Sequence, residues 1–133
     1  MSKSLIQVAN QSNQTVAVES VISLGSVQRR YGCGLNLSGN GIEVTGDGYF
    51  TIDASVSVAP TAADTVTIAL YSNGVQIPGA ISYSAVATAT NPTTLPITAT
   101  IRQRCCNNPV TLTLVLISGA GVVQNVSMRV EKV

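Results

Sequence analysis

The sequence predicts a single-domain, all-β, antiparallel sandwich of about eight to ten short strands. Three observations lead to this fold class. Apolar side chains alternate with polar ones in several segments, turns rich in Gly and Asn separate these segments, and no segment shows the i, i+3, i+4 spacing of an amphipathic helix. The length of 133 residues is typical of one domain.

Alternation with a period of two identifies the individual strands. The longest alternating segment covers residues 50–58, and shorter ones cover 66–70, 81–87, 95–101 and 126–130. In a strand with one buried face, the apolar members of such a series point into the core. The expected inward series therefore include Phe50, Ile52, Ala54, Val56 and Val58, and also Ile81, Tyr83, Ala85 and Ala87.

Two segments predict a particular place in the sheets. Pro96 has no backbone N–H to donate, so the strand that contains it is expected at an edge or a bulge. In residues 110–117 the second face is also apolar from Val115 onward. Such a strand is either central and covered on both faces or part of a subunit contact, and the low charge of the chain favours the contact.

The segments between strands predict tight hairpins. Residues 38–41, 45–48 and 72–74 contain the Gly, Asn and Asp residues that tolerate positive φ angles. Residues 1–24 show little alternation and are predicted to form a peripheral N-terminal strand or an anchoring arm. Residues 25–133 are then the sandwich domain, and the two parts form one compact unit.

The residue content argues against an enzyme. The chain has no His, which removes the usual general base and the Ser-His-Asp and Cys-His catalytic sets. Its six carboxylates form neither a calcium loop nor a nucleotide-binding motif. Glu43 and Asp47 flank one hairpin, where solvation is favoured over a calcium site. We expect no catalytic residues, no metal and no cofactor.

Charge and hydropathy restrict the partners. Charged residues make up 10% of the chain and the net charge is +1, so a nucleic-acid partner is not expected. No apolar run reaches the roughly 18 residues of a membrane span. Hydrophobic residues make up 45%, and charge is sparse for the surface of a 13.7 kDa monomer, which predicts a homo-oligomer that hides apolar surface. The alternative is a monomer solvated by its many Ser, Thr, Asn and Gln side chains.

The cysteines and the N-terminus bear on the compartment. Residues 1–7 carry one basic residue but no apolar stretch of a secretion signal, so synthesis in the cytoplasm is expected. Cys33, Cys105 and Cys106 are an odd number, which favours reduced, buried thiols. A disulfide from Cys33 to one of the adjacent pair, or a metal site, remains open.

Several strand motifs resemble the tumour-necrosis-factor/C1q-like jelly rolls. Residues 48–58 open with Gly-Tyr-Phe and resemble the central "GxYxI" strand of that superfamily. Residues 66–74 resemble its next strand with the "NG" turn, and residues 126–133 its last strand. Residues 30–42 resemble the lead-in of small bacterial and phage forms, such as the C-terminal domain of a spore-surface collagen-like glycoprotein.

The resemblance implies a ten-stranded jelly roll that assembles as a homotrimer and binds or decorates rather than catalyses. This chain has neither a collagen-like stalk before the jelly roll nor the aromatic belt of animal members, so the trimer core is expected to be mostly aliphatic. The candidates for this trimer interface are Tyr49, Phe50, Leu114, Leu116 and Met128.

The expected function is that of a structural or display protein on a larger particle. A protein without a secretion signal reaches the outside on a particle assembled within the cell, and small proteins similar to this one occur in phage virions. We therefore predict that the protein decorates a capsid or forms a head fibre of a phage virion. The alternative particle is a spore, with this protein on its surface. The alternative function is a carbohydrate- or receptor-binding module with Tyr71, Asn73 and Tyr83 as ligand-loop candidates.

Charged side chains on the predicted strands are candidates for ion pairs or for contacts with a partner. Asp53 lies mid-strand on a polar face and is predicted to pair with Arg102 or Arg104 across the sheet or across subunits. Arg29 and Arg30 form a basic cluster beside a tyrosine. Solvated strand ends explain this cluster best, and an acidic capsid face, a nucleic acid or an anionic sugar is the functional alternative.

Overall fold

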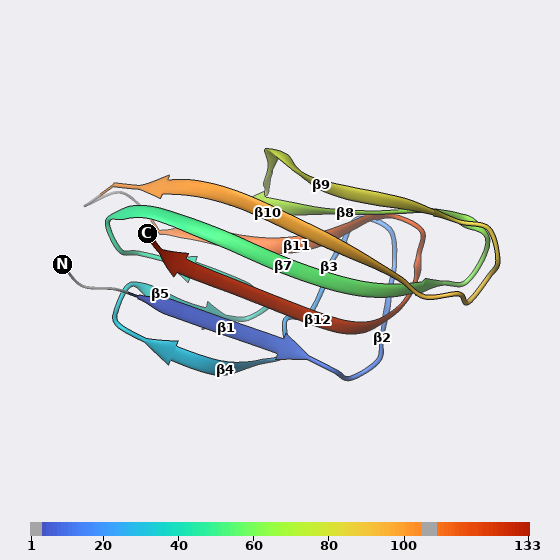
Figure 1. The fold of residues 1–133 in the computed structure, drawn as a ribbon, viewed down its shortest axis with the longest axis horizontal. Coiled ribbons are helices and arrows are strands. Elements are labelled where there is room, and N and C mark those ends of the chain that lie inside the picture. Colours follow the sequence, from blue (N-terminus) through green and yellow to red (C-terminus); the bar gives the residue numbers. More distant parts are fainter. Residues whose placement is uncertain (1–3, 105–108) are drawn as a thin grey trace.

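The computed structural model describes residues 4–104 and 109–133, which form a sandwich of two antiparallel sheets (Figure 1). Sheet I has the strand order β10-β7-β12-β1-β4, with β2 beside β12. Sheet II has the order β5-β6-β11-β8-β9, with β3 beside β11. The strands are β1 Leu5–Asn10, β2 Gln14–Val16, β3 Ser20–Val21, β4 Ser26–Tyr31, β5 Leu35–Ser38, β6 Gly41–Val44, β7 Gly48–Pro60, β8 Asp64–Ser72, β9 Val75–Val86, β10 Thr93–Gln103, β11 Val110–Ser118 and β12 Gly121–Lys132.

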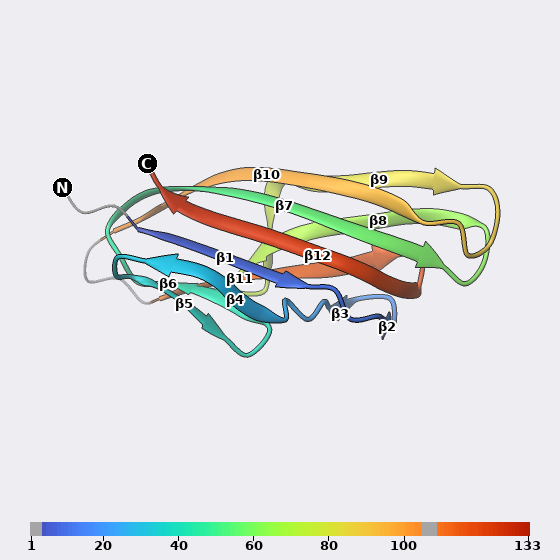
Figure 2. The ribbon, with the colours of Figure 1, turned by 60° about the horizontal axis from the view of Figure 1, so that its bottom comes forward.

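The predicted fold class is confirmed. The described part of the chain contains twelve strands, of which β2 and β3 span only three and two residues. The ten longer strands form the two layers, which Figure 2 shows lying over one another. No helix among the described residues has the length and apolarity that a membrane span requires.

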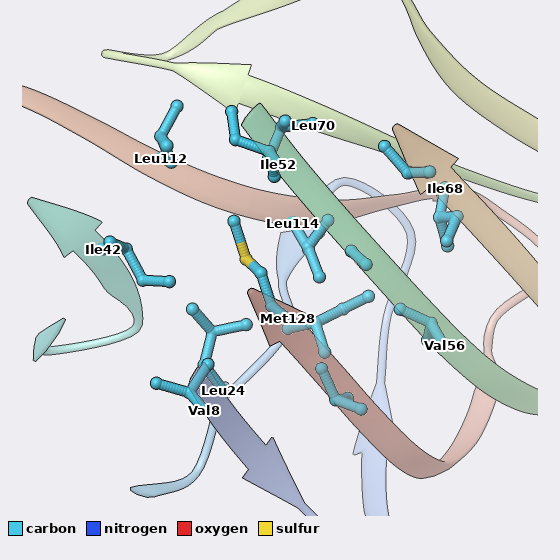
Figure 3. Packing of buried hydrophobic residues seen from close by; sticks show 14 of the residues in the cluster. Val8, Leu24, Ile42, Ile52, Val56, Ile68, Leu70, Leu112, Leu114 and Met128 are labelled. Atoms are coloured by element: carbon cyan, nitrogen blue, oxygen red, sulfur yellow. The ribbon is translucent and has the colours of Figure 1, made fainter. Parts of the chain in front are cut away.

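The core is one apolar layer between the two sheets, as Figure 3 shows. Most of the long strands contribute alternate side chains to it, because successive side chains of a strand point to opposite faces. The edge strand β4 is different, since all six of its residues are exposed. Phe50, Ile52 and Val56 of β7 are fully buried, as the alternation predicts. Sheet II meets them with Ile68 and Leu70. Burial of this layer is the main source of stability.

The edge position predicted for the Pro96 strand is confirmed. β10 pairs only with β7 and closes one side of sheet I. Pro96 stands opposite Ser55 and is exposed. The hairpins predicted at residues 38–41 and 72–74 are confirmed, because β5 pairs with β6 and β8 pairs with β9. Residues 45–48 were predicted as a third hairpin, but they connect β6 of sheet II to β7 of sheet I, so this prediction is wrong. In the β8–β9 hairpin, Asn73 and Gly74 have φ angles of 50° and 81°. Two consecutive positive φ angles match the twist that a two-residue hairpin requires.

The face predicted to be buried in β9 is the wrong one. Ile81 and Tyr83 point outward, with 42% and 71% of their surface exposed, whereas Ala80 and Val86 are buried. The pairing of β9 with β8 shifts register between Ala69 and the next paired position, and this irregularity sets the orientation of the strand. Small residues on both faces gave too little contrast in hydrophobicity to identify the inner one.

The N-terminal segment is part of the sandwich rather than an arm. β1 lies between β12 and β4, and its Ile6 and Val8 are fully buried. Leu24, further along the same segment, is also fully buried. Gly25 then turns the chain into β4 with φ of 77°, where an added Cβ would overlap the carbonyl oxygen of Ala9. Of the two alternatives predicted for this segment, the structure has a strand, which lies inside the sheet with two hydrogen-bonded neighbours rather than at its periphery.

Replacement of Ile6 by Ala tests this placement. We expect Ile6→Ala to lower the free energy of unfolding by about 2–5 kcal/mol, because it leaves a cavity in the core. Gln7→Ala, one residue along on the outer face, is the control and should change it by no more than about 0.5 kcal/mol. Urea unfolding at one fixed protein concentration measures both, and equal effects would contradict the inner position of β1.

Candidate functional site

Four of the five residues predicted for a trimer interface lie in the core of the single chain. Phe50, Leu114, Leu116 and Met128 have no exposed surface, and Figure 3 shows Leu114 and Met128 packed between the sheets. Alternation identifies the inward face of a strand, but it does not say whether that face meets the other sheet or another subunit. Their assignment to a subunit surface is therefore corrected to core packing.

Tyr49 is the interface candidate that does reach the surface. It lies at the start of β7 on the outer face of sheet I and is 53% exposed. The guanidinium carbon of Arg102 lies 5.4 Å from the centre of its ring. The backbone N–H of Val133 donates to the Tyr49 carbonyl oxygen at 2.9 Å, so the end of the chain holds this position. An aromatic ring beside a guanidinium is typical of interface centres.

Asp53 forms the predicted cross-strand ion pair, but with a different arginine. Its carboxylate oxygen Oδ2 accepts a hydrogen bond from Nη2 of Arg129 at 2.6 Å. Register explains the difference, because Arg129 of β12 stands directly opposite Asp53, whereas Arg102 stands opposite Tyr49. The hydrogen bond and the charge of Asp53 raise the pKa of Arg129 above its ordinary value, so this side chain remains charged.

A polar groove crosses the outer face of sheet I beside this ion pair. It consists of a hollow of about 270 Å³ next to Asp53 and a larger one of about 570 Å³ over β1 and β4. One cross-strand row at its centre contains Arg29, Gln7, Arg129 and Asp53. Neither hollow was predicted from the sequence. The four residues of the row lie far apart in the chain, and only the register between β4, β1, β12 and β7 brings them together.

The outer face of sheet II has a different character. One row across β3, β11, β8 and β9 contains Val21, Val115, Ala69 and Ile81. Val115 is only 7% exposed even though it lies on the outside, because its row neighbours shield it. The apolar second face of residues 110–117 is thus explained by a central strand with an apolar outer row. Its predicted role in a subunit contact stays a prediction.

The ligand-loop candidates do not form one site. Tyr71 and Tyr83 both lie on the outer face of sheet II, but Tyr83 stands opposite Thr67, which lies four residues or about 13 Å along the strand from Tyr71. Asn73 holds the hairpin to β11: its side-chain oxygen accepts from the Thr111 N–H at 2.8 Å. Its Nδ2 also donates to the Pro109 carbonyl at 3.5 Å. Both polar atoms of the Asn73 side chain are therefore used to hold the hairpin against the start of β11.

Cys33 is exposed, which corrects the expected burial of this thiol. It follows Gly32 in the turn between β4 and β5, and its backbone carbonyl accepts a hydrogen bond from the Ser4 hydroxyl at 2.7 Å. Cys105 and Cys106 lie outside the described residues, so their pairing or metal binding stays open. Among residues 4–104 and 109–133, no three His, Cys, Asp or Glu side chains gather as metal ligands would.

Solved structures share this arrangement along almost the whole chain. Murine APRIL, a TNF-family protein, has a TM-score of 0.76 at 11% identity, and the match covers 99% of this chain and 100% of that one. The globular domain of zebrafish complement 1qA has a TM-score of 0.68 at 8% identity, covering 95% and 94%. This chain has the TNF/C1q-like jelly-roll fold.

The jelly roll also occurs in a virus vertex. Vertex protein P5 of phage PRD1 matches with a TM-score of 0.65 at 11% identity, over 98% of this chain and 96% of that one. Neither a protein-family model nor a curated protein sequence matches the chain. At such low identities the likeness describes the jelly roll alone, and the nearer resemblance to bacterial and spore-surface forms stays a prediction.

The structural role of Asn73 in this jelly roll is testable. Asn73→Gly keeps the positive φ angle without strain but removes both side-chain hydrogen bonds. We expect a loss of about 1 kcal/mol in the free energy of unfolding, and a smaller loss for Asn73→Asp, which keeps the acceptor for the Thr111 N–H. Thermal unfolding compares the stability of the two variants with that of the wild type. Wild-type stability in Asn73→Gly would show that the two side-chain hydrogen bonds of Asn73 do not stabilise the hairpin.

Proposed function

We propose that this protein is a non-enzymatic display module that forms a homotrimer on a larger particle. We further propose that the particle is a phage virion, where the protein decorates the capsid or heads a fibre. The observation that carries the proposal is the jelly roll shared almost end to end with a C1q globular domain and with a phage vertex protein. The TNF/C1q-like resemblance implies three copies around a three-fold axis.

The chemistry of the chain supports a binding role. Without His, a proton-transfer site near neutral pH would depend on a perturbed carboxylate, thiol or lysine. Asp53, the mid-strand carboxylate, is already bound to Arg129. We therefore expect this sandwich to bind partners through the shape and composition of its surface rather than to catalyse a reaction.

The proposed subunit contact includes Tyr49 on the outer face of sheet I. Its ring is half exposed and is flanked by Arg102, and Tyr and Arg are enriched where interfaces are fully desolvated. Neighbouring outward residues of β7 and β10 have short side chains, among them Thr51, Ser55 and Thr98. A flat surface of short side chains allows another subunit to approach closely.

Attachment to a particle is expected to use a surface of the folded jelly roll. Residues 5–10 do not serve as an anchoring arm, since Ile6 and Val8 of β1 are buried in the core. The loop between β8 and β9 and the loop between β9 and β10 lie in different parts of the fold. Asn73 contacts Thr111 at the start of β11, whereas Thr90 donates its N–H to Pro60 at the end of β7.

Solution mass tests the trimer. We expect a species of about 41 kDa by light scattering, three times the 13.7 kDa chain, that persists on dilution and in reductant. Tyr49→Ser should shift this species toward monomer at concentrations where the wild type stays assembled. Tyr83→Ser, which removes a more exposed tyrosine from sheet II, is the matched control and should leave the mass unchanged.

The opposite results are equally informative. A wild-type monomer at all concentrations would overturn the trimer, and dissociation by Tyr83→Ser alone would move the contact to sheet II. Dissociation by reductant would make the cysteines responsible. Circular dichroism of each variant separates loss of assembly from loss of fold.

Co-sedimentation tests the particle. Cells that carry the gene are lysed after particle production, and the protein is followed by antibody through a density gradient. We expect it in the particle fraction. Recovery only as free protein, while a capsid protein bands with the particles, would overturn the virion assignment and leave the trimer unaffected.

A carbohydrate- or receptor-binding module is the second candidate. The observation that favours it is the arginine-lined groove on sheet I.

A further inference from the structure

The groove over β1 and β4 combines charge, amides and an aromatic ring in one hollow of about 570 Å³. This volume falls in the range of small-molecule sites. Its polar and aromatic lining consists of Gln7, Gln28, Arg29, Arg30, Tyr31 and Arg129. Leu5 adds an apolar wall at the end where the ring of Tyr31 lies opposite it in the register.

Strand register brings the two central arginines to the same face. Gln7 of β1 stands opposite Arg29 of β4 on one side and opposite Arg129 of β12 on the other. The two arginines are therefore two strand spacings apart, about 10 Å between backbones, with an amide between them. The bulge in the β1–β4 pairing follows Gln7 and leaves Gln28 at the groove wall without a partner in the strand register. Nε2 of Gln28 donates to the Ser26 hydroxyl at 3.2 Å, and its amide oxygen is the acceptor that a sugar hydroxyl would use.

The arginines differ in what they already bind. Arg129 is paired with Asp53, and Nε of Arg30 donates to the Leu35 carbonyl oxygen at 2.7 Å. Across the described part of the chain, no carboxylate lies within ion-pair distance of Arg29. Arg29 thus brings a positive charge to the groove with no anion beside it, and its planar guanidinium suits a carboxylate bound by two hydrogen bonds.

The remaining lining suits a sugar ring. Amide groups donate to and accept from hydroxyls, and both Gln7 and Gln28 provide them. Tyr31 is 52% exposed, so its ring offers an apolar surface with a polar tip. We propose that this groove binds an acidic sugar, with the sugar carboxylate on Arg29, hydroxyls on the two glutamine amides and a ring face against Tyr31.

The proposed sugar site is independent of the proposed assembly. Its lining residues lie on β4, β1 and β12, whereas Tyr49 lies on β7 and Arg102 on the edge strand β10. A failure of sugar binding would leave the trimer and the particle assignment intact, and a monomeric protein would still carry the groove.

Titration of the ¹⁵N-labelled full chain with D-glucuronate tests the site by NMR. We expect saturable shifts of the backbone amides of Gln7, Gln28, Arg29 and Tyr31. D-Glucose, which has the same ring without the carboxylate, and inorganic phosphate, which has charge without the ring, should each bind at least about tenfold more weakly. Equal binding of phosphate would reduce the site to a general anion site and overturn the sugar assignment.

A pair of charge-matched variants locates the binding. Arg29→Gln should weaken glucuronate binding about tenfold or more, since one charge-assisted contact is lost. Arg104→Gln removes the same charge from an exposed position after β10 and should leave the affinity unchanged. Equal weakening in both would show a non-specific effect of net charge and overturn the proposal.

Light scattering of the same variants separates a sugar from a neighbouring subunit as the partner of Arg29. We expect the mass of Arg29→Gln to equal that of the wild type. A change of mass without any effect on glucuronate binding would assign Arg29 to a contact between copies of this chain, and would overturn the sugar site.

Discussion

The apolar layer between the two sheets is the constraint on which the rest of this structure depends. Most of the long strands commit one face to this layer, and the burial drives the two sheets together. The layer is complete only when both ends of the chain are in place. β12 lies between β7 and β1, and Ile6 and Val8 of β1 cover the part of the core that β12 alone leaves open.

Because the inward faces are used for stability, the outer faces are what remains for function. They differ in character: sheet I presents short polar side chains, an ion pair and an arginine-lined groove, whereas sheet II presents an apolar row through Val115 and Ala69. The difference lies in the outward residues of each row: sheet II has one apolar row, with Val115 beside Ala69, between rows that contain Thr and Tyr. The corresponding central row of sheet I contains Arg, Gln and Asp.

This division explains why proteins at 8–11% identity share the fold. An apolar side chain at every second position satisfies the core, and many residue choices meet that condition. The outward positions carry no such requirement, so murine APRIL, a complement 1qA domain and a phage vertex protein share one architecture with this chain. The properties specific to this chain therefore lie in outward residues such as Arg29, Tyr49 and Arg129.

The sequence by itself determined the all-β class, the β7 strand with its inward series from Phe50, the edge position of Pro96 and the Asn73-Gly74 hairpin. Each depends on local physics: side-chain alternation, a missing N–H, or tolerance of positive φ. Tertiary structure alone decided that Met128 is core rather than interface, that Asp53 pairs with Arg129, and that residues 5–10 are an inner strand. These depend on which strands become neighbours and in what register, and that choice is made by contacts between segments far apart in the chain.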